Sequence, residues 1–485
     1  MALGALAVPI GSRQSGSPTV QAFAMEVRLL GKRANMTLVG FLQAQNCSNL
    51  PGSWRHPEAI PDFLTADHYV RIARTLEEGK FHLAFFDDRL AMPDIYGDDY
   101  RTAVKYGIRS VKMDLIPLLT AMGMATRHIG LGGTYSTTYY EPFHVARTFQ
   151  TLDLMVGGRA AWNVVTSLND SEAVNMGAAE HLPHDMRYDR ADEFIECVLG
   201  HWNSWEDDAL VVDQRPGGIF ADPDKVHRLN YEGKHFKSRG PFTVPRSPQG
   251  HPLVIQAGQS GRGKTFAARW GELIFASYKS LASAQAQYRD LKAAIAEAGR
   301  NPDHVHIAPP IYAVVGETRS IAKEKEAFLA SLTQPEDALC LLGEILNFDF
   351  AGRDLDTPMT DEDMRAMTGQ QALRDRVAQA AGTAHPTTRD FIDLSKRGTL
   401  YEMPVFCGTA SDVADEMEAW FLGDGCDGFV VAATHRPGSY EDFTRYVVPE
   451  LQRRGVFHTE YRGTTLRENM GLPRPIARGV PKRTI

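Results

Sequence analysis

Residues 161–170 have the pattern of a buried strand whose carboxyl end carries polar side chains. The segment begins Ala-Trp-Asn-Val-Val and ends in a group of small polar residues, namely Thr166, Ser167, Asn169 and Asp170. Ligand sites of α/β proteins form where apolar strands give way to polar groups. Asn163 and Ser167 are therefore candidate ligand-binding residues, because inward-pointing polar atoms need hydrogen-bond partners.

Residues 258–265 form a second candidate site, one that suits an anion. They read Gly-Gln-Ser-Gly-Arg-Gly-Lys-Thr and satisfy the phosphate-loop pattern G-x-x-x-x-G-K-[ST]. Glycines such as Gly258 let backbone N–H groups approach an anion at a helix N-terminus, and Ser260 adds a hydroxyl donor. We therefore expect this loop to bind a phosphate group.

A nucleotide hydrolase is one interpretation of that loop. The apolar run at 82–87 ends in an aspartate of the kind that holds magnesium, and Lys264 with Thr265 completes the pattern. Two features argue against it. The acidic strand lies far ahead of the loop in the chain, and several strand–helix units precede the loop, whereas phosphate-loop folds generally begin near it. The hydrolase is kept as the alternative.

The elements that position these residues alternate regularly between strand and helix. Strand-like runs cover 37–41, 82–87, 129–135, 160–166, 253–256, 273–277, 306–314 and 428–432. Amphipathic segments follow them near 66–79, 115–125, 143–155, 187–202, 261–270, 281–299, 318–331 and 440–453, and a further helix is expected near 410–422. Thr65 and Ser411 are the expected N-caps of two of these helices. Eight such units predict an α/β fold, a (β/α)8 TIM barrel.

Long insertions interrupt the barrel, mostly on the face that carries active sites. They lie at about 42–64, 88–113, 168–186, 203–252 and 332–409. All but 203–252 follow a strand, and 332–409 is expected to act as a lid. Residues 36–460 are predicted to form a single domain, with 1–35 as a flexible N-terminal extension and 461–485 as a C-terminal tail.

Composition excludes several classes of partner. The net charge of −8 and the lack of a Lys/Arg run argue against nucleic acid and anionic membranes. No apolar stretch approaches 20 residues, so no membrane span is expected. Five scattered cysteines without CxxC spacing favour a reducing, cytoplasmic location.

Three segments together resemble a known family. They are 139–147 (YYEPFHVAR), 161–170 (AWNVVTSLND) and 184–193 (HDMRYDRADE). They are similar to the bacterial luciferase-like flavin-dependent monooxygenases, in the branch of nitrilotriacetate, dibenzothiophene-sulfone and long-chain-alkane monooxygenases. The resemblance extends from about residue 36 to about residue 461.

The resemblance implies that FMN is the cofactor and indicates the residues that bind it. In this branch the loop after the fifth strand reads Ala-Gly-x-Ser-x-x-Gly and holds the flavin phosphate, and Ala257, Gly258, Ser260 and Gly263 match it. Asp88 matches a position beside the flavin ring. Asn163, Ser167 and Tyr188 match positions that bond the flavin or its ribityl chain. Thr134 and Ser136 are weaker candidates for the same cavity.

The implied activity is that of the oxygenase component of a two-component monooxygenase. Such an enzyme receives reduced FMN (FMNH2) from a separate NAD(P)H:flavin reductase. It forms a flavin C4a-hydroperoxide with O2 and oxygenates a small organic substrate. A deazaflavin-dependent oxidoreductase or a non-catalytic flavin binder on the same barrel remains open. The relatives form homodimers or homotetramers, and the same is expected here.

The substrate side departs from the family pattern. Relatives carry a histidine shortly before Trp-Arg-His, where this chain has Ser48 or Asn49, with Cys47 nearby. A second family histidine corresponds to His385. Asn49, Cys47 and His385 are therefore the candidate catalytic residues.

The substrate itself is expected to be an apolar aromatic or organosulfur compound. Phe41, Phe85 and Phe406 are candidates for an apolar pocket, and the loops show no dense cluster of Arg or Lys. The H-x-x-H at His181 and His184 lacks the further ligands of a metal site, so no metal is expected.

Overall fold

The computed structural model describes residues 36–167, 169–258 and 261–477. A single sheet of parallel strands dominates it, in the order β11-β10-β12-β1-β2-β3-β4-β7-β8-β9. Its strands are β1 (Thr37–Gln43), β2 (Leu83–Asp87), β3 (Gly130–Ser136), β4 (Ala160–Val165), β7 (Leu253–Gln256), β8 (Leu273–Phe275), β9 (His306–Ala308), β10 (Pro310–Val315), β11 (Val405–Gly408) and β12 (Gly428–Ala432).

The sheet closes into a barrel through the predicted run at 306–314. This run is split into β9 and β10 at Pro309, which has no N–H to donate. β9 pairs with β8, and β10 pairs with β12. The N–H groups of Asp427 and Val430 donate to the carbonyls of Ile307 and Pro309, at 2.8 and 2.9 Å. The predicted (β/α)8 TIM barrel is therefore confirmed, and β11 is an additional strand, paired with β10, that we did not predict.

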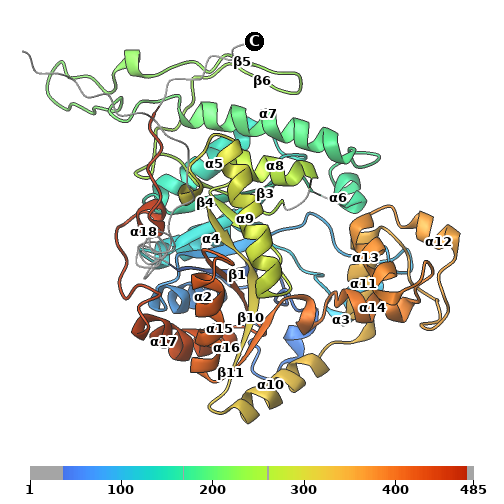
Figure 1. Ribbon diagram of the computed structural model, residues 1–485. Helices are drawn as coiled ribbons and strands as arrows, with labels where there is room; N and C mark the ends of the chain where they lie inside the picture. Colours follow the sequence, from blue (N-terminus) through green and yellow to red (C-terminus); the bar gives the residue numbers. More distant parts are fainter. Residues whose placement is uncertain (1–35, 168, 259–260, 478–485) are drawn as a thin grey trace, which may run out of the picture.

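Helices follow the strands and pack around the barrel (Figure 1). They are α2 (Ala66–Glu78), α4 (Leu115–Ala125), α5 (Pro142–Met155), α7 (His184–Trp202), α8 (Gly261–Trp270), α9 (Leu281–Glu297), α10 (Arg319–Ser331), α15 (Ala410–Leu422), and α16, η5 and α17 (Gly438–Asp442, Phe443–Val447 and Val448–Arg453). Thr65 caps α2 as predicted, because its hydroxyl accepts from the His68 N–H. The predicted Ser411 cap is wrong: Thr409 caps α15 through the Asp412 N–H.

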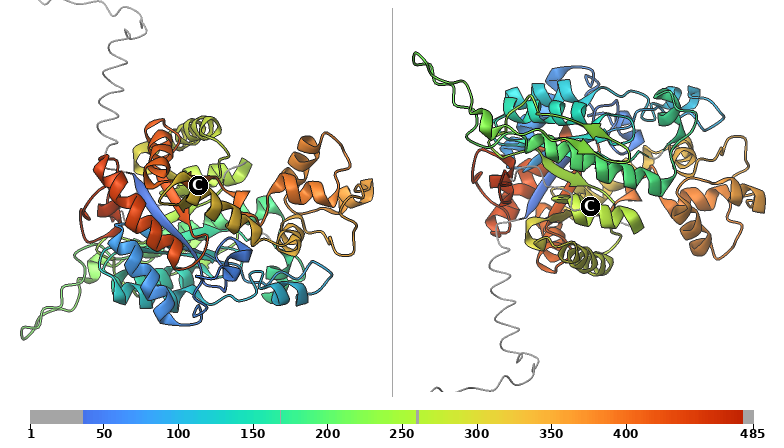
Figure 2. Two further views of the ribbon diagram at one scale, coloured as in Figure 1. Left: turned by 90° about the horizontal axis from the view of Figure 1, so that it is seen from below. Right: turned by 90° about the horizontal axis from the view of Figure 1, so that it is seen from above.

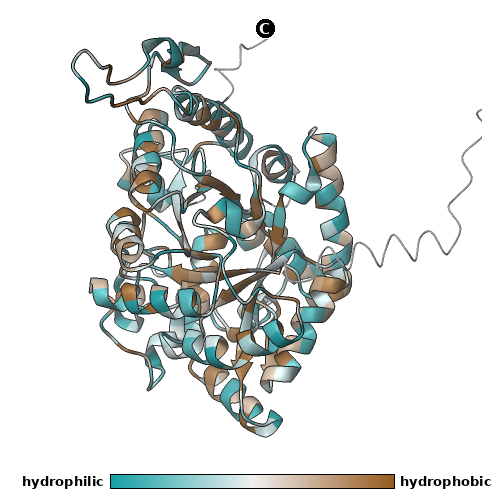
Figure 3. Cartoon of the chain, turned by 90° about the vertical axis from the view of Figure 1, so that its left-hand side faces the viewer, coloured by the Kyte–Doolittle hydropathy of each residue, from teal (hydrophilic) through white to brown (hydrophobic). Residues whose placement is uncertain are grey.

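Apolar side chains fill both the inside of the barrel and the layer between strands and helices. Figure 3 shows the apolar strands at the centre and mixed helices around them. Phe85 lies inside the barrel between Phe41 and Phe275, with ring centroids 5.7 and 4.6 Å away. Phe406 instead packs outside the barrel wall against Trp420 and Phe429. The expectation that Phe406 lines the same apolar pocket is therefore wrong.

The long insertions form distinct structures on the barrel. The 88–113 segment holds α3 (Arg101–Tyr106), and 168–186 holds α6 (Asp170–Asn175). The 203–252 segment holds the two-stranded β5 (Tyr231–Glu232) and β6 (Lys237–Ser238). The 332–409 segment holds α11 (Pro335–Leu346), α12 (Asp361–Ala366), α13 (Gln371–Ala381) and α14 (Thr388–Ser395). These four helices share their own apolar core and project from one side of the barrel (Figures 1 and 2).

The other end of the barrel is covered by the chain's last described residues. We expected a tail from residue 461, and α18 (Leu466–Met470) lies within it. Leu466 and Met470 pack into the cluster that fills the barrel, and Arg467 is 1% exposed. The expected extension at 1–35 lies outside the described residues. Within the described part, no helix is long and apolar enough to span a membrane.

Candidate active site

Four of the candidate residues lie in or just beyond the carboxyl halves of neighbouring parallel strands, namely Asp88 after β2, Thr134 in β3, and Asn163 and Ser167 in and after β4. β2, β3 and β4 are adjacent in the sheet, and Thr134 in β3 stands beside Asn163 in β4. Parallel strands place all their carboxyl ends at one end of a barrel, so these side chains share one region.

Asn163 has a buried oxygen that is ready to accept a hydrogen bond. The Thr134 hydroxyl donates to the carbonyl of Phe86 at 2.8 Å, so its oxygen is left to accept. It accepts from Asn163 Nδ2 at 2.9 Å, which fixes the orientation of the amide. Asn163 Oδ1 then has no partner among the described residues, although the side chain is only 4% exposed. A buried acceptor in this state indicates a ligand with an N–H or O–H donor.

Ser167 adopts a backbone conformation that is unusual for a residue other than glycine. Its φ is +54°, in the left-handed region. Its carbonyl accepts from Arg187 at 2.7 Å, and its hydroxyl donates to Ser136 Oγ at 3.0 Å. Strained residues that are held by several bonds occur often at ligand sites. The structure thus brings Ser167 and Ser136 together, as expected.

Tyr188 and the glycine-rich loop form a tight backbone cradle. A Cβ placed on Gly263 would lie 2.7 Å from the Tyr188 hydroxyl, and one placed on Gly258 would collide with the Gly263 carbonyl. α8 begins at Gly261, and the first N–H groups of a helix have no partners within the helix, which suits an anion. Ser260, the third predicted phosphate residue, lies outside the described residues.

Lys264 faces away from this cradle. Its Nζ pairs with Asp290 of α9. Thr265 is exposed on α8, and its hydroxyl lies 3.5 Å from the Gly261 carbonyl. The lysine of a phosphate loop has to reach the phosphates. The pairing with Asp290 therefore gives no support to the nucleotide hydrolase.

Asp88 lines an inner cavity of about 410 Å³ together with Arg89, Lys112 and Tyr140. Burial raises the pKa of Asp88 to about 7, while the nearby Lys112 charge acts in the opposite direction. One carboxylate oxygen accepts from the Arg89 N–H at 2.8 Å. Asp88 is thus half-buried, faces a cavity and changes its protonation state near neutral pH.

Asn49 and Cys47 lie together on the loop after β1. Asn49 Oδ1 accepts from Arg109 at 3.1 Å and from Gln43 at 3.3 Å. Cys47 is 1% exposed, and its sulfur accepts from Gln45 at 3.3 Å. Burial raises the pKa of the Cys47 thiol, so the thiol stays protonated at neutral pH. This group can bind and orient a ligand, but it does not offer a thiolate nucleophile.

The structure does not bring His385 together with Asn49 and Cys47. Its Nδ1 lies 3.0 Å from the Met359 carbonyl, and its Nε2 lies 3.8 Å from Asp361. Both partners belong to the 332–409 insertion, and the imidazole is 44% exposed. The catalytic role of His385 remains a prediction.

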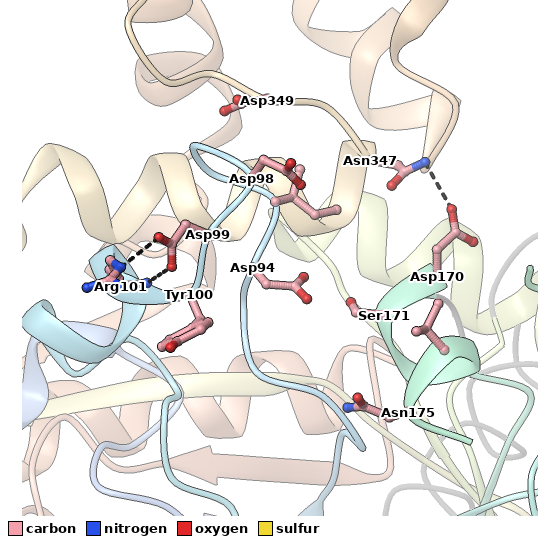
Figure 4. A pocket seen from close by; sticks show the side chains of 12 residues that line it. Asp94, Asp98, Asp99, Tyr100, Arg101, Asp170, Ser171, Asn175, Asn347 and Asp349 are labelled. Carbon is pink, nitrogen blue, oxygen red and sulfur yellow. Dashed lines mark hydrogen bonds and ion pairs between the residues drawn. The ribbon is translucent and has the colours of Figure 1, made fainter. Parts of the chain in front are cut away.

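An outer cavity of about 820 Å³ opens between three insertions. Figure 4 shows Asp94, Asp98 and Asp99 on one side of it and Asp170 with Asn347 on the other. Asn347 donates to Asp170 at 3.1 Å. The outer and inner cavities share Asn175 as a lining residue, so the two cavities are neighbours and are lined mainly by the 88–113, 168–186 and 332–409 segments.

The histidines of the predicted H-x-x-H have other partners. His181 Nδ1 lies 2.8 Å from the Tyr139 hydroxyl, and its Nε2 faces Arg187. His184 is exposed and pairs with Asp185.

His56, Glu58 and His435 form a cluster of metal-ligand type elsewhere. The two imidazoles are stacked 3.7 Å apart with planes only 6° from parallel. A metal ion binds in the plane of an imidazole, so one ion cannot lie in both planes. This arrangement therefore does not suit a metal.

Sequence reasoning missed two basic residues, Arg109 and Lys112. Both lie at the end of the 88–113 insertion, just before α4. Arg109 contacts Asn49, and Lys112 lines the inner cavity. Two basic residues at the point where an insertion returns to the barrel are the only sequence signal for them.

Comparisons with known proteins agree with this geometry. The family model described as luciferase-like monooxygenase matches residues 45–421. A dibenzothiophene-sulfone monooxygenase of Rhodococcus erythropolis is 44% identical, over 93% of this chain and 99% of the relative. Nitrilotriacetate monooxygenase component A of Aminobacter aminovorans is 39% identical, over 87% of this chain and 94% of the relative.

A solved structure is also similar over most of its length. The crystal structure of a riboflavin lyase with modified FMN and riboflavin superposes with a TM-score of 0.82 at 31% identity, covering 92% of this chain and 98% of that chain. The barrel, the polar groups at its carboxyl end and these matches lead to one conclusion. The chain belongs to the luciferase-like monooxygenases, and it is an enzyme of that family.

Proposed function

We propose that the chain is the oxygenase component of a two-component monooxygenase that uses reduced FMN. A separate NAD(P)H:flavin reductase supplies the reduced FMN, and O2 is the second substrate. The observation that carries the proposal is the buried, unpartnered Asn163 Oδ1 at the same barrel end as the Gly258–Gly263 cradle. A flavin fits both features, because it combines ring N–H donors with a terminal phosphate.

The residues present fit FMN along its length. Gly258, Ser260 and the N-terminus of α8 would hold the phosphate, with Tyr188 beside them. Ser167 would contact the ribityl chain, and Asn163 and Asp88 would contact the ring. The riboflavin lyase, whose crystal structure contains modified FMN, shares this fold at 31% identity, which supports the choice of cofactor.

The chain's own residues bind the reactants, orient them and exclude water. Bound reduced FMN supplies the two electrons that split O2, so that one oxygen atom enters the substrate and the other leaves as water. Asn163, fixed by Thr134, sets the orientation of the ring. Asp88 can hold or release a proton near neutral pH, because burial raises its pKa to about 7. The 88–113 and 332–409 insertions limit access of water to this end of the barrel.

We propose a small, largely apolar aromatic or organosulfur substrate. Phe41, Phe85 and Phe275 form an apolar interior directly below the polar site. The dibenzothiophene-sulfone monooxygenase at 44% identity acts on such a compound by its name. We also propose that Asn49 orients the substrate, since it or its neighbour Ser48 occupies the position of the family histidine.

The test is oxygen incorporation from 18O2. The full chain is combined with NADH, FMN, a separate flavin reductase and dibenzothiophene sulfone or methyl phenyl sulfone. We expect a product with one 18O atom, formed only when both FMN and reductase are present. Lys264→Ala is expected to leave this activity unchanged, because Lys264 pairs with Asp290 away from the cradle. Magnesium-dependent ATP hydrolysis that Lys264→Ala abolishes would support the nucleotide hydrolase instead.

A further inference from the structure

We propose that Arg109 and Lys112 recognise an oxyanion group on the substrate, such as a carboxylate, sulfinate or sulfonate. This inference rests on the proposed function and narrows its substrate class. The substrate would then be a small molecule with an apolar body and one anionic end.

Arg109 is a buried cation with few bonds. It is 4% exposed, and the hydrogen bonds of its side chain run from one nitrogen to the Asn49 carbonyl and side chain, at 3.4 and 3.1 Å. Its Nε has no hydrogen-bond partner among the described residues, and none of their carboxylates lies within ion-pair distance. The Arg109 charge does help to lower the pKa of Glu402, a carboxylate that pairs with Arg397. Its backbone φ of +50° lies in the left-handed region. A buried guanidinium has five N–H donors to satisfy, so this one is prepared to bind more than Asn49.

Lys112 lies three residues further along the same segment and faces the inner cavity of about 410 Å³. It has no hydrogen bond and no ion pair with any residue that the structure describes. Burial lowers its pKa, while Asp87 and Asp88 act in the opposite direction. An ammonium group at a cavity wall with three free donors is suited to an anion.

The neighbouring cations have partners, which sets these two apart. Arg89 pairs with Glu344 at 3.2 Å, and Arg397 pairs with Glu402. Arg436 donates to the backbone carbonyls of Gln43, Gln45 and Cys47. These bonds give each of the three arginines a structural role. Arg109 and Lys112 lack such bonds.

Lys112 lines the cavity, and Arg109 donates to Asn49 on the loop after β1. By the family resemblance, Asn49 or its neighbour Ser48 replaces a histidine of the relatives. The chain thus lacks the titratable histidine of its relatives and has instead the permanent positive charge of Arg109 beside Asn49. The outer cavity carries aspartates and would repel an anion at long range. The pair therefore selects its ligand by direct contact, and a molecule with a single anionic group is favoured over a polyanion.

Reduced flavin is the other anion that Lys112 could meet, because Asp88 lines the same cavity. The test therefore measures substrate and flavin binding separately. Benzenesulfonate and methyl phenyl sulfone share a phenyl ring and a sulfonyl group, and they differ in charge. Their affinities for the full chain are measured by calorimetry with and without FMN, and FMN affinity is measured by flavin fluorescence.

We expect benzenesulfonate to bind at least about tenfold more tightly than the sulfone, and Lys112→Met to remove most of that difference. Lys112→Arg should retain it, and Arg109→Lys should reduce it. Lys105→Met is the matched control, because Lys105 is exposed on α3 of the same insertion and its loss changes the net charge equally. FMN affinity should change less than about twofold in each variant.

Two results would overturn the inference. One is equal affinity of the wild-type chain for the sulfonate and the sulfone. The other is a Lys112→Met chain that keeps the preference for the sulfonate but loses affinity for FMN, since Lys112 would then serve the flavin. Neither measurement needs oxygen or turnover. Failure of the monooxygenase proposal would instead appear as absent FMN binding or absent 18O in the product.

Discussion

Arg159 and Arg109 are equally buried at opposite ends of the barrel, and they differ in how well they are bonded. Each is 4% exposed. Arg159, just before β4, donates five hydrogen bonds, four of them to backbone carbonyls or a hydroxyl of the 123–129 segment. Among the residues that the structure describes, the Arg109 side chain, beyond the carboxyl end of the strands, donates only to Asn49.

The difference in bonding between Arg159 and Arg109 suggests that polar groups at the amino end stabilise the fold, whereas those at the carboxyl end bind ligands. At the amino end, Arg467 also binds the Glu272 carboxylate, at 2.5 and 2.9 Å, below the packed α18. Polar groups there hold chain segments together. At the carboxyl end, Asn163 Oδ1 and Arg109 Nε are buried without partners among the described residues, and so is Arg467 Nε at the amino end. The two ends therefore differ in how many hydrogen bonds their buried arginines form in total. One end of the barrel thus stabilises the fold, and the other is prepared for ligands.

The largest expected effect is the loss of stability in Arg159→Met. The substitution leaves several buried carbonyls without donors, at about 1–3 kcal/mol each, so a total loss of about 4 kcal/mol is expected. Arg109→Met should change stability by less than about 1 kcal/mol, because it removes a buried charge that has no ion-pair partner. Thermal unfolding of both variants checks this, and equal losses would remove the distinction between the two ends.

Gly258→Ala should weaken FMN binding by about 100-fold, the next largest effect. Its Cβ would collide with the Gly263 carbonyl and force open the cradle that is proposed to hold the phosphate. Gly299→Ala is the control, since Gly299 has a φ of +77° at the end of α9 and open space around it. It should reduce stability and leave FMN affinity unchanged. Similar losses of FMN affinity in both variants would contradict the assignment.

Asp88 at the carboxyl end of the barrel and Glu272 at the amino end should affect the free energy of unfolding with opposite dependence on pH. Burial raises the pKa of Asp88 to about 7, so its ionisation costs stability between about pH 4 and 7, and the cost is complete above pH 7. Asp88→Asn should therefore stabilise the chain by about 2 kcal/mol at pH 8 and by little at pH 4.

The pKa of Glu272 is shifted the other way. Burial raises it, but the charge and hydrogen bonds of Arg467, together with smaller contributions from His251 and the Val254 N–H, outweigh burial and lower it to about 2. Glu272→Gln should destabilise the chain above its ordinary pKa, and the effect should fade as the pH falls towards 2. Unfolding measured from pH 3 to 8 follows both variants. Parallel curves for the two substitutions would contradict the comparison.

The smallest effect is expected for Cys47→Ala. The thiol is buried and burial raises its pKa, so it should react slowly with iodoacetamide and take no part as a nucleophile. We expect kcat to change less than about threefold. A loss of activity beyond about 100-fold, with KM unchanged, would instead make Cys47 a catalytic residue.

Most of the barrel was predictable because its strands and helices follow simple periodic patterns. Each predicted strand is present, and the helix after it begins within a few residues of its predicted start. Two features were not predictable from periodicity. The run at 306–314 divides at Pro309 and closes the barrel, and β11 lies at the end of the 332–409 segment, all of which the sequence predicts to be an insertion.

The site was predictable where it depends on strand ends and not where it depends on loops. Asn163, Thr134, Ser167 and Asp88 were found because the carboxyl ends of adjacent strands must meet. Arg109 was missed because its partner, Asn49, lies 60 residues away on another insertion. No local pattern in the sequence determines how two insertions approach each other.

The most direct test of the account is an anaerobic titration of the full chain with reduced FMN. The account predicts saturation at one FMN per chain, and at least about tenfold weaker binding to Asn163→Leu, because Leu has no acceptor in place of the amide oxygen. Arg109→Lys should bind reduced FMN as the wild-type chain does. If Asn163→Leu binds reduced FMN as tightly as the wild type, or if neither binds it, the claim that this end of the barrel holds the flavin is wrong.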